Sequence, residues 1–203
     1  MKKILCLLAM IVAMMMSLCA CSSESKGEQL MIEGHEIFYE VERSDRVEDE
    51  AMIALVRELL VEENDFYFKM SCDWVDSIDQ SQQYEMDGGI YFPVIEEGIS
   101  SWSDYEDMAR SYYTESYIQD EFTPYYVPHV YREDDEKLYR AMADGIGNSL
   151  IEDSVEVYQR ADGLYYVTVL TNSDMEGSKN TYILEKVGEG KHMFRIAAKT
   201  GLL

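Results

Sequence analysis

The apolar residues of this chain change their spacing once, near residue 127, and this change limits the folds that the chain can adopt. Before that point they recur every three or four positions, as in the stripe formed by Met52, Leu55, Val56, Leu59 and Leu60. Such a stripe is typical of a helix with one buried face. Farther along, apolar and polar residues alternate, which is the pattern of half-buried strands. Helices followed by strands predict an α+β fold rather than alternating βαβ units.

Two capping patterns indicate where helices begin. Asp45 and Glu48 form a D-x-x-E capping box, which predicts the start of a long helix that reaches about Met70. Ser103 and Glu106 repeat this pattern at the start of a second helix.

Proline residues indicate where other elements end. Pro124 is predicted to end a short third helix that begins at Thr114. Pro93 lies in the apolar run 90–95 and has no backbone N–H to donate. This run is therefore predicted to be an edge strand or a docked loop.

The second half of the chain predicts a series of antiparallel hairpins. Asp162-Gly163 joins two alternating runs, and glycine tolerates the positive φ that a tight hairpin turn requires. The predicted strands are 127–132, 137–143, 151–160, 164–171, 181–187 and 192–199. The predicted architecture is N-terminal helices packed on a curved antiparallel β-meander.

One core should join the helical stripe to the sheet, because the stripe needs an apolar surface to cover it. The residues predicted to be buried together are Leu55, Val56, Leu59, Phe66, Val167, Val169, Ile183 and Ile196.

The first residues of the chain resemble a bacterial lipoprotein signal. Lys2 and Lys3 precede the apolar run 4–16, which is too short to be a comfortable transmembrane helix. The run ends in Leu18-Cys19-Ala20-Cys21, which resembles the lipobox that a lipoprotein-processing peptidase recognises. The resemblance implies that Cys21 becomes the N-terminus and carries a diacylglycerol. Two acyl chains would anchor the protein on the extracytoplasmic face of the cell membrane.

This signal divides the chain into three parts. We predict a signal peptide at 1–20, a flexible tether at 21–44 and a single α+β domain at 45–203. Once Cys21 is lipidated, the mature domain retains only Cys72, so an intramolecular disulfide is excluded and stability must come from core packing.

Cys72 is predicted to be a small buried residue rather than a nucleophile. A catalytic thiol needs a paired histidine. The spacing of His35, His129 and His192 recommends no such pair.

Charge and motifs exclude several functions. The chain has 17 Lys and Arg against 40 Asp and Glu, a net charge of −23 at pH 7. Nucleic-acid binding is excluded, because contacts to phosphates require clustered basic residues. The chain contains no G-x-x-x-x-G-K-[ST], H-E-x-x-H or G-x-S-x-G motif. We therefore predict no catalytic residue and no cofactor.

The segment 172–177 imitates the first positions of a calcium-binding loop. Position twelve of such a loop would be Ile183, where a bidentate glutamate is required. The segment is therefore predicted to be a polar turn, and no metal site is predicted.

Two features are candidates for a partner-binding site. One is the acidic run Glu133, Asp134, Asp135 and Glu136. It is either a solvated hairpin tip or an acidic finger that docks into a basic cleft. The other is the pair Tyr125 and Tyr126, which is flanked by prolines and is predicted to be an exposed recognition loop.

The order of elements and several short motifs resemble a known family. The motifs are Ser103–Met108, Tyr113–Tyr117 leading to Phe122, Tyr131, Asp135–Tyr139 and Met193–Ile196. Over residues 44–199 the chain resembles the IseA family of secreted DL-endopeptidase inhibitors. More broadly, it resembles the cystatin-like and nuclear transport factor 2-like domains of bacterial lipoproteins.

This resemblance implies a cone-shaped α+β domain without catalytic activity. Its implied role is to bind and inhibit an NlpC-type cell-wall hydrolase outside the cell, and a basic hydrolase would be attracted to so acidic a domain. The alternative is a module that binds a small apolar or aromatic molecule between the first helix and the sheet.

Overall fold

The structure is a computed structural model, and it describes residues 45–71, 75–142, 149–172 and 178–200. The chain divides into two units, Met1–Ser44 and Asp45–Leu203, and every described residue lies in the second. The predictions for the signal peptide, the tether, Cys21, Cys72 and residues 173–177 therefore fall outside the described residues.

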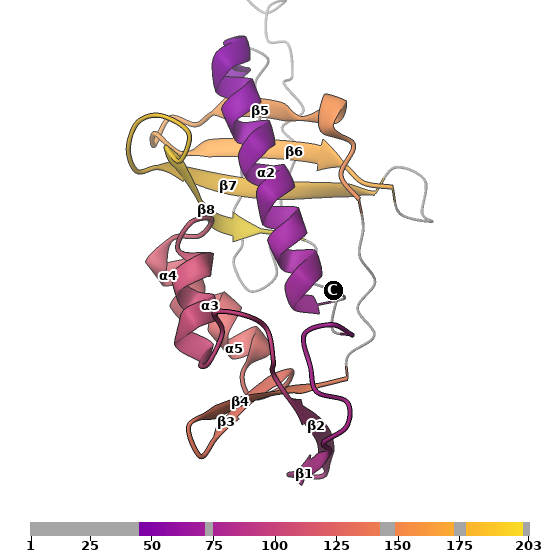
Figure 1. Ribbon diagram of the computed structural model, residues 1–203. Helices are drawn as coiled ribbons and strands as arrows, with labels where there is room; N and C mark the ends of the chain where they lie inside the picture. Colours follow the sequence, from indigo (N-terminus) through magenta and orange to yellow (C-terminus); the bar gives the residue numbers. More distant parts are fainter. Residues whose placement is uncertain (1–44, 72–74, 143–148, 173–177, 201–203) are drawn as a thin grey trace, which may run out of the picture. The chain divides into compact units, whose positions relative to one another are not determined.

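The predicted α+β fold is confirmed, because helices pack on antiparallel sheets (Figure 1). The long helix α2 (Glu50–Ser71) is capped by Asp49, whose Oδ1 accepts hydrogen bonds from two backbone N–H groups of the first turn, at 3.0 and 3.3 Å. The predicted capping box at Asp45 and Glu48 is wrong. The chain before the helix is extended instead, and the Val47 N–H donates to the Val157 carbonyl at 2.9 Å.

The C-terminal part of the domain forms a four-stranded antiparallel meander. Its strands, in chain order, are β5 (Glu156–Gln159), β6 (Tyr165–Leu170), β7 (Lys179–Lys186) and β8 (Phe194–Lys199). The predicted hairpin between β5 and β6 is confirmed, and Gly163 lies in its turn with a φ of 87°. Helix α2 lies across this sheet, as the helical stripe requires (Figure 1).

A second four-stranded sheet has the order β1-β2-β4-β3. Its strands are β1 (Tyr84–Met86), β2 (Gly89–Pro93), β3 (Tyr131–Asp134) and β4 (Lys137–Ala141). The predicted β3–β4 hairpin is present, but it does not continue into the meander, because β4 pairs with β2.

Strand β2 lies between β1 and β4, so the predicted edge position of the run 90–95 is wrong. The strand tolerates Pro93 because this residue is its last, and the missing N–H removes no bond from the centre of the sheet. The Pro93 carbonyl accepts a hydrogen bond from the Asp79 N–H at 2.9 Å.

Short helical segments follow β2 in the chain. They are α3 (Trp102–Ala109), α4 (Glu115–Tyr117), a π-helical turn (Ile118–Phe122) and α5 (Thr123–Tyr126). The segment before α4 pairs with β8, because the Thr114 N–H donates to the Ile196 carbonyl at 3.0 Å.

Helix α3 begins earlier than predicted. Ser101 and Asp104 form its capping box, in place of Ser103 and Glu106. The backbone N–H groups of Ser100 and Ser101 donate to the Asp104 carboxylate, both at 2.8 Å, and lower its pKa to about 2. Because this pKa is lowered, the stabilisation is fully present above the ordinary value of 3.8 and is lost as the pH falls through about 2.

Thr114 caps α4 as predicted, since its Oγ1 accepts a hydrogen bond from the Tyr117 N–H at 3.3 Å. Pro124, however, does not end the helical run, which continues to Tyr126. Proline is accepted there because it lies in the first turn of α5, where a missing N–H costs little.

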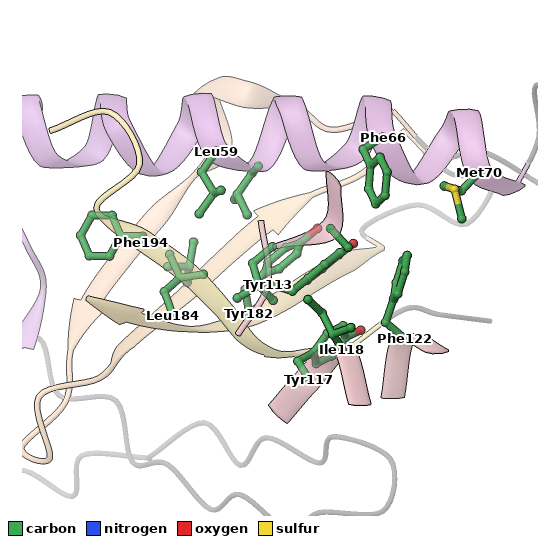
Figure 2. Close-up of a cluster of buried hydrophobic side chains, with 14 of the residues drawn as sticks. Leu59, Phe66, Met70, Tyr113, Tyr117, Ile118, Phe122, Tyr182, Leu184 and Phe194 are labelled. Carbon is green, nitrogen blue, oxygen red and sulfur yellow. The ribbon is translucent and has the colours of Figure 1, made fainter. Parts of the chain in front are cut away.

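The core lies between α2, the short helices and one face of the β5–β8 sheet. Figure 2 shows Leu59, Phe66 and Met70 of α2 directed toward aromatic and aliphatic side chains of the sheet and the short helices. The predicted core residues that belong to this cluster are Val56, Leu59, Phe66, Val167, Val169 and Ile196.

Two predicted core residues lie elsewhere. Leu55 is only half-buried, because it lies at the margin of the buried face of α2. Ile183 is buried, but it points to the opposite face of β7 from its neighbours Tyr182 and Leu184, which belong to the core cluster.

Candidate protein-binding site

The predicted acidic run forms the end of the β3–β4 hairpin. Asp134 pairs with Lys137 across the strands, so Asp135 and Glu136 alone make the turn. Their φ values of 47° and 61° are those of a type I′ turn. The side chains of Asp134, Asp135 and Glu136 are exposed, and they make no ion pair or hydrogen bond with another described residue. We call these three residues the acidic tip.

Glu133, the fourth predicted acid, has a different role. Its Oε1 accepts a hydrogen bond from the backbone N–H of Trp102 at 2.6 Å. Trp102 is the first residue of α3, so this carboxylate lies at the positive end of the helix dipole. Glu133 therefore fixes the hairpin to α3 and positions the acidic tip, while its own charge is engaged within the domain.

The two tyrosines predicted to form a recognition loop differ in their exposure to solvent. Tyr125 is 38% exposed, whereas Tyr126 is 1% exposed. The Tyr126 hydroxyl and the Ser71 Oγ are hydrogen-bonded at 2.8 Å, and burial raises the pKa of Tyr126. The predicted exposure of Tyr126 is wrong because α5 continues past Pro124 and turns this ring inward. Only Tyr125 remains available to a partner.

Sequence reasoning missed a polar cluster inside the core. Lys199 Nζ lies 2.5 Å from Glu63 Oε1, and their side chains are only 5% and 2% exposed. The Tyr113 hydroxyl donates to the same carboxylate oxygen, and Lys199 Nζ lies 4.4 Å from the centre of the Tyr67 ring. Burial and the adjacent Glu63 charge raise the pKa of Tyr113 well above its ordinary value. The cluster ties α2 to β8.

The predicted ligand pocket between the first helix and the sheet receives no support from the packing. Side chains of α2, the short helices and the sheet meet there in one buried cluster (Figure 2). Phe66 stacks on Tyr112 and Phe122, with ring centres 5.2 and 5.9 Å apart. These rings fill the space between α2 and the short helices.

Within the described ranges, no group of three His, Cys, Asp or Glu side chains could hold a metal ion. No helix in this part of the chain is long and apolar enough to cross a membrane. His129 and His192 are both exposed.

Comparison with protein-family models and with curated proteins gives no match for this chain.

Proposed function

We propose that this protein is a lipid-anchored, extracytoplasmic binding module that captures a basic cell-wall hydrolase through its acidic tip and inhibits it without performing catalysis. The observation that carries the proposal is the geometry of the tip. Three exposed carboxylates lie on a two-residue turn, and Glu133 fixes the base of that turn to α3.

Preorganisation is the first supporting argument. A loop that is already fixed in one conformation loses little entropy when a partner binds. The I′ turn leaves the tip few alternative conformations, and the hydrogen bond from Trp102 to Glu133 holds the hairpin in place. The hairpin backbone is therefore fixed before a partner binds, and only the side chains of the acidic tip lose freedom on contact.

Long-range electrostatic attraction also supports the proposal. With a net charge of −23, the chain attracts basic proteins before contact. Such steering raises the association rate and depends on ionic strength, because salt screens charges beyond about 10 Å at 0.1 M. The exposed ring of Tyr125 offers apolar contact area of the kind that slows dissociation.

The proposal also rests on the resemblance to secreted inhibitors of DL-endopeptidases of the NlpC type, and on the lipobox-like sequence that ends at Cys21. A tether of residues 21–44 would keep the domain close to the membrane while letting it reach enzymes in the wall.

Neutralising the acidic tip should slow capture without unfolding the domain. We expect the triple variant Asp134→Asn, Asp135→Asn, Glu136→Gln to associate roughly tenfold more slowly with a basic wall endopeptidase at low salt. The variant should also weaken inhibition of muropeptide cleavage. The measurements are association rates by surface plasmon resonance over a range of salt concentrations, together with turnover of the endopeptidase.

A matched variant separates the tip from the total charge. Glu152→Gln, Asp153→Asn, Glu189→Gln removes three exposed acids elsewhere and leaves the tip intact. If both triple variants associate equally fast at every ionic strength, the tip is only a solvated turn and the proposed contact site is wrong. If the parent protein does not slow any endopeptidase, inhibition itself is wrong.

Removing the lipidation site should release the protein from the membrane. We expect Cys21→Ala to abolish acyl labelling and to leave the protein either unprocessed or in the aqueous phase, because no diacylglycerol can be attached. Detergent phase partitioning and labelling with a fatty-acid analogue test this. Unchanged partitioning and labelling in the variant would contradict the lipoprotein assignment.

A further inference from the structure

Arg140 of β4 is fully buried, and three of its five guanidinium N–H groups have no hydrogen-bond partner. Its exposed fraction is 0%. Only Nη1 has partners, the Ser77 Oγ at 3.2 Å and the Lys69 carbonyl at 3.5 Å. Nε and Nη2 are buried and donate no hydrogen bond. No carboxylate among the described residues forms an ion pair with this guanidinium.

The two unused nitrogens are the ones that bind carboxylates side-on. Nε and Nη2 lie on the same edge of the planar guanidinium, and their N–H groups point in parallel. A carboxylate fits this edge through two charge-assisted hydrogen bonds. An unpaired cation in the interior is strongly unfavourable, so orphaned donors of this kind require a partner.

The surroundings compensate this charge only in part. The guanidinium carbon lies 5.4 Å from the centre of the Tyr131 ring. Its contact with the Lys69 carbonyl places it at the negative end of the α2 dipole. The carboxylate of Glu96 is already bound by the Lys69 ammonium and by the Tyr105 hydroxyl.

The strand face that carries Arg140 reaches an exposed margin of the sheet. It pairs with Phe92, and side chains two residues along a strand share the same face. The next residues on this face are Ile90 and Met142, which are 50% and 57% exposed. The strand face that carries Arg140 therefore continues from the buried core to an exposed margin.

We propose that Arg140 anchors a binding site for a monovalent carboxylate, held by Nε and Nη2 between the end of α2 and the β2–β4 face of the sheet. Arg140 provides one positive charge that no carboxylate of the described residues pairs with, so a single negative charge balances it. A dianion such as sulfate would bring a second charge into the interior without a partner. The site is separate from the acidic tip and does not depend on hydrolase capture.

The test is thermal unfolding of the full chain in detergent, in sodium acetate, sodium chloride and sodium sulfate at equal ionic strength. A ligand that binds only the folded state stabilises it by mass action. We expect acetate to raise the melting temperature by about 5 °C with saturation, chloride to raise it less, and sulfate to give a rise without saturation, because sulfate stabilises folded proteins generally by exclusion from their surface. An acetate effect no larger than that of chloride would overturn the site. A sulfate response that saturates and is lost in Arg140→Met would overturn the ligand class.

Variants of Arg140 test whether the acetate-dependent rise in melting temperature comes from the guanidinium. Arg140→Met should lose the acetate response, and Arg140→Lys, which keeps the charge but not the fork, should bind acetate at least tenfold more weakly. Arg132→Lys is the matched control, since Arg132 lies on the neighbouring strand and pairs with Asp87. It should respond as the parent does. A full acetate response in Arg140→Met would overturn the proposal.

The Nε–H resonance of Arg140 in the parent protein provides a second measurement, which is needed if Arg140→Met does not fold. We expect this resonance to move when acetate is added. A resonance that stays in place overturns the proposal. Asp73, which lies outside the described residues, is tested because it is an acid close in the chain to the end of α2. If Asp73→Asn lowers the melting temperature and acetate restores it, the chain supplies the carboxylate itself and a ligand site is ruled out.

Discussion

Lys199→Met should lower the free energy of unfolding by about 3–5 kcal/mol, because it leaves the buried carboxylate of Glu63 without its counter-charge. Lys199 and Glu63 are separated by 136 positions in the chain, yet their charged atoms are 2.5 Å apart. The Tyr113 hydroxyl would remain as a hydrogen-bond donor to Glu63 but carries no compensating charge. Urea unfolding followed by circular dichroism measures the loss.

Two further variants test whether the effect comes from the pair. The double variant Glu63→Leu, Lys199→Met should recover most of the loss, since a well-packed apolar pair often matches a buried ion pair. Lys191 also joins α2 to the β7–β8 hairpin, but its contacts with Glu58 and Glu62 are solvent-exposed. Lys191→Met should therefore change stability by no more than about 1 kcal/mol. Equal losses in Lys191→Met and Lys199→Met would contradict this account.

Leu59→Ala should destabilise the domain by about 2–5 kcal/mol, because it opens a cavity where α2 meets the sheet. Leu59 is 5% exposed and belongs to the core cluster (Figure 2). The melting temperature, measured by calorimetry, should fall accordingly.

Leu55→Ala is the matched control, with the same chemical change on the same helix. Leu55 is only half-buried, so its truncation removes fewer contacts and should cost clearly less than that of Leu59. If the two variants lose the same stability, α2 presents a different face to the sheet than the structure shows.

The contrast between Leu55 and Leu59 shows which buried residues a helical repeat can predict. A helical repeat identifies a stripe, and Val56, Leu59 and Phe66 of that stripe are buried. It does not locate the margins of the stripe, because these depend on how the helix is rotated against the sheet. The same repeat places Glu63, four residues after Leu59, on the buried face of the helix, but it gives no sign of the partner that balances this charge, because the last strand contributes Lys199.

In the candidate site, too, some features follow from local sequence and others depend on the tertiary structure. The acidic run and its hairpin were predicted from local pattern, and the exposure of Asp134, Asp135 and Glu136 agrees with it. The role of Glu133 depends on a helix that begins 31 positions earlier in the chain. Residues 133 and 134 carry the same charge, and only the position of α3 distinguishes them.

By itself, the sequence determined what depends on neighbouring residues: the long amphipathic helix, the hairpin at Gly163, the cap at Thr114 and the α+β class. Hydrogen bonds and apolar repeats over a few positions are sufficient for these. Only the tertiary structure decided that β4 pairs with β2, that Tyr126 turns inward, and that Glu63 meets Lys199. These contacts join segments far apart in the chain, and their free energy comes from burial and charge pairing that no local pattern contains.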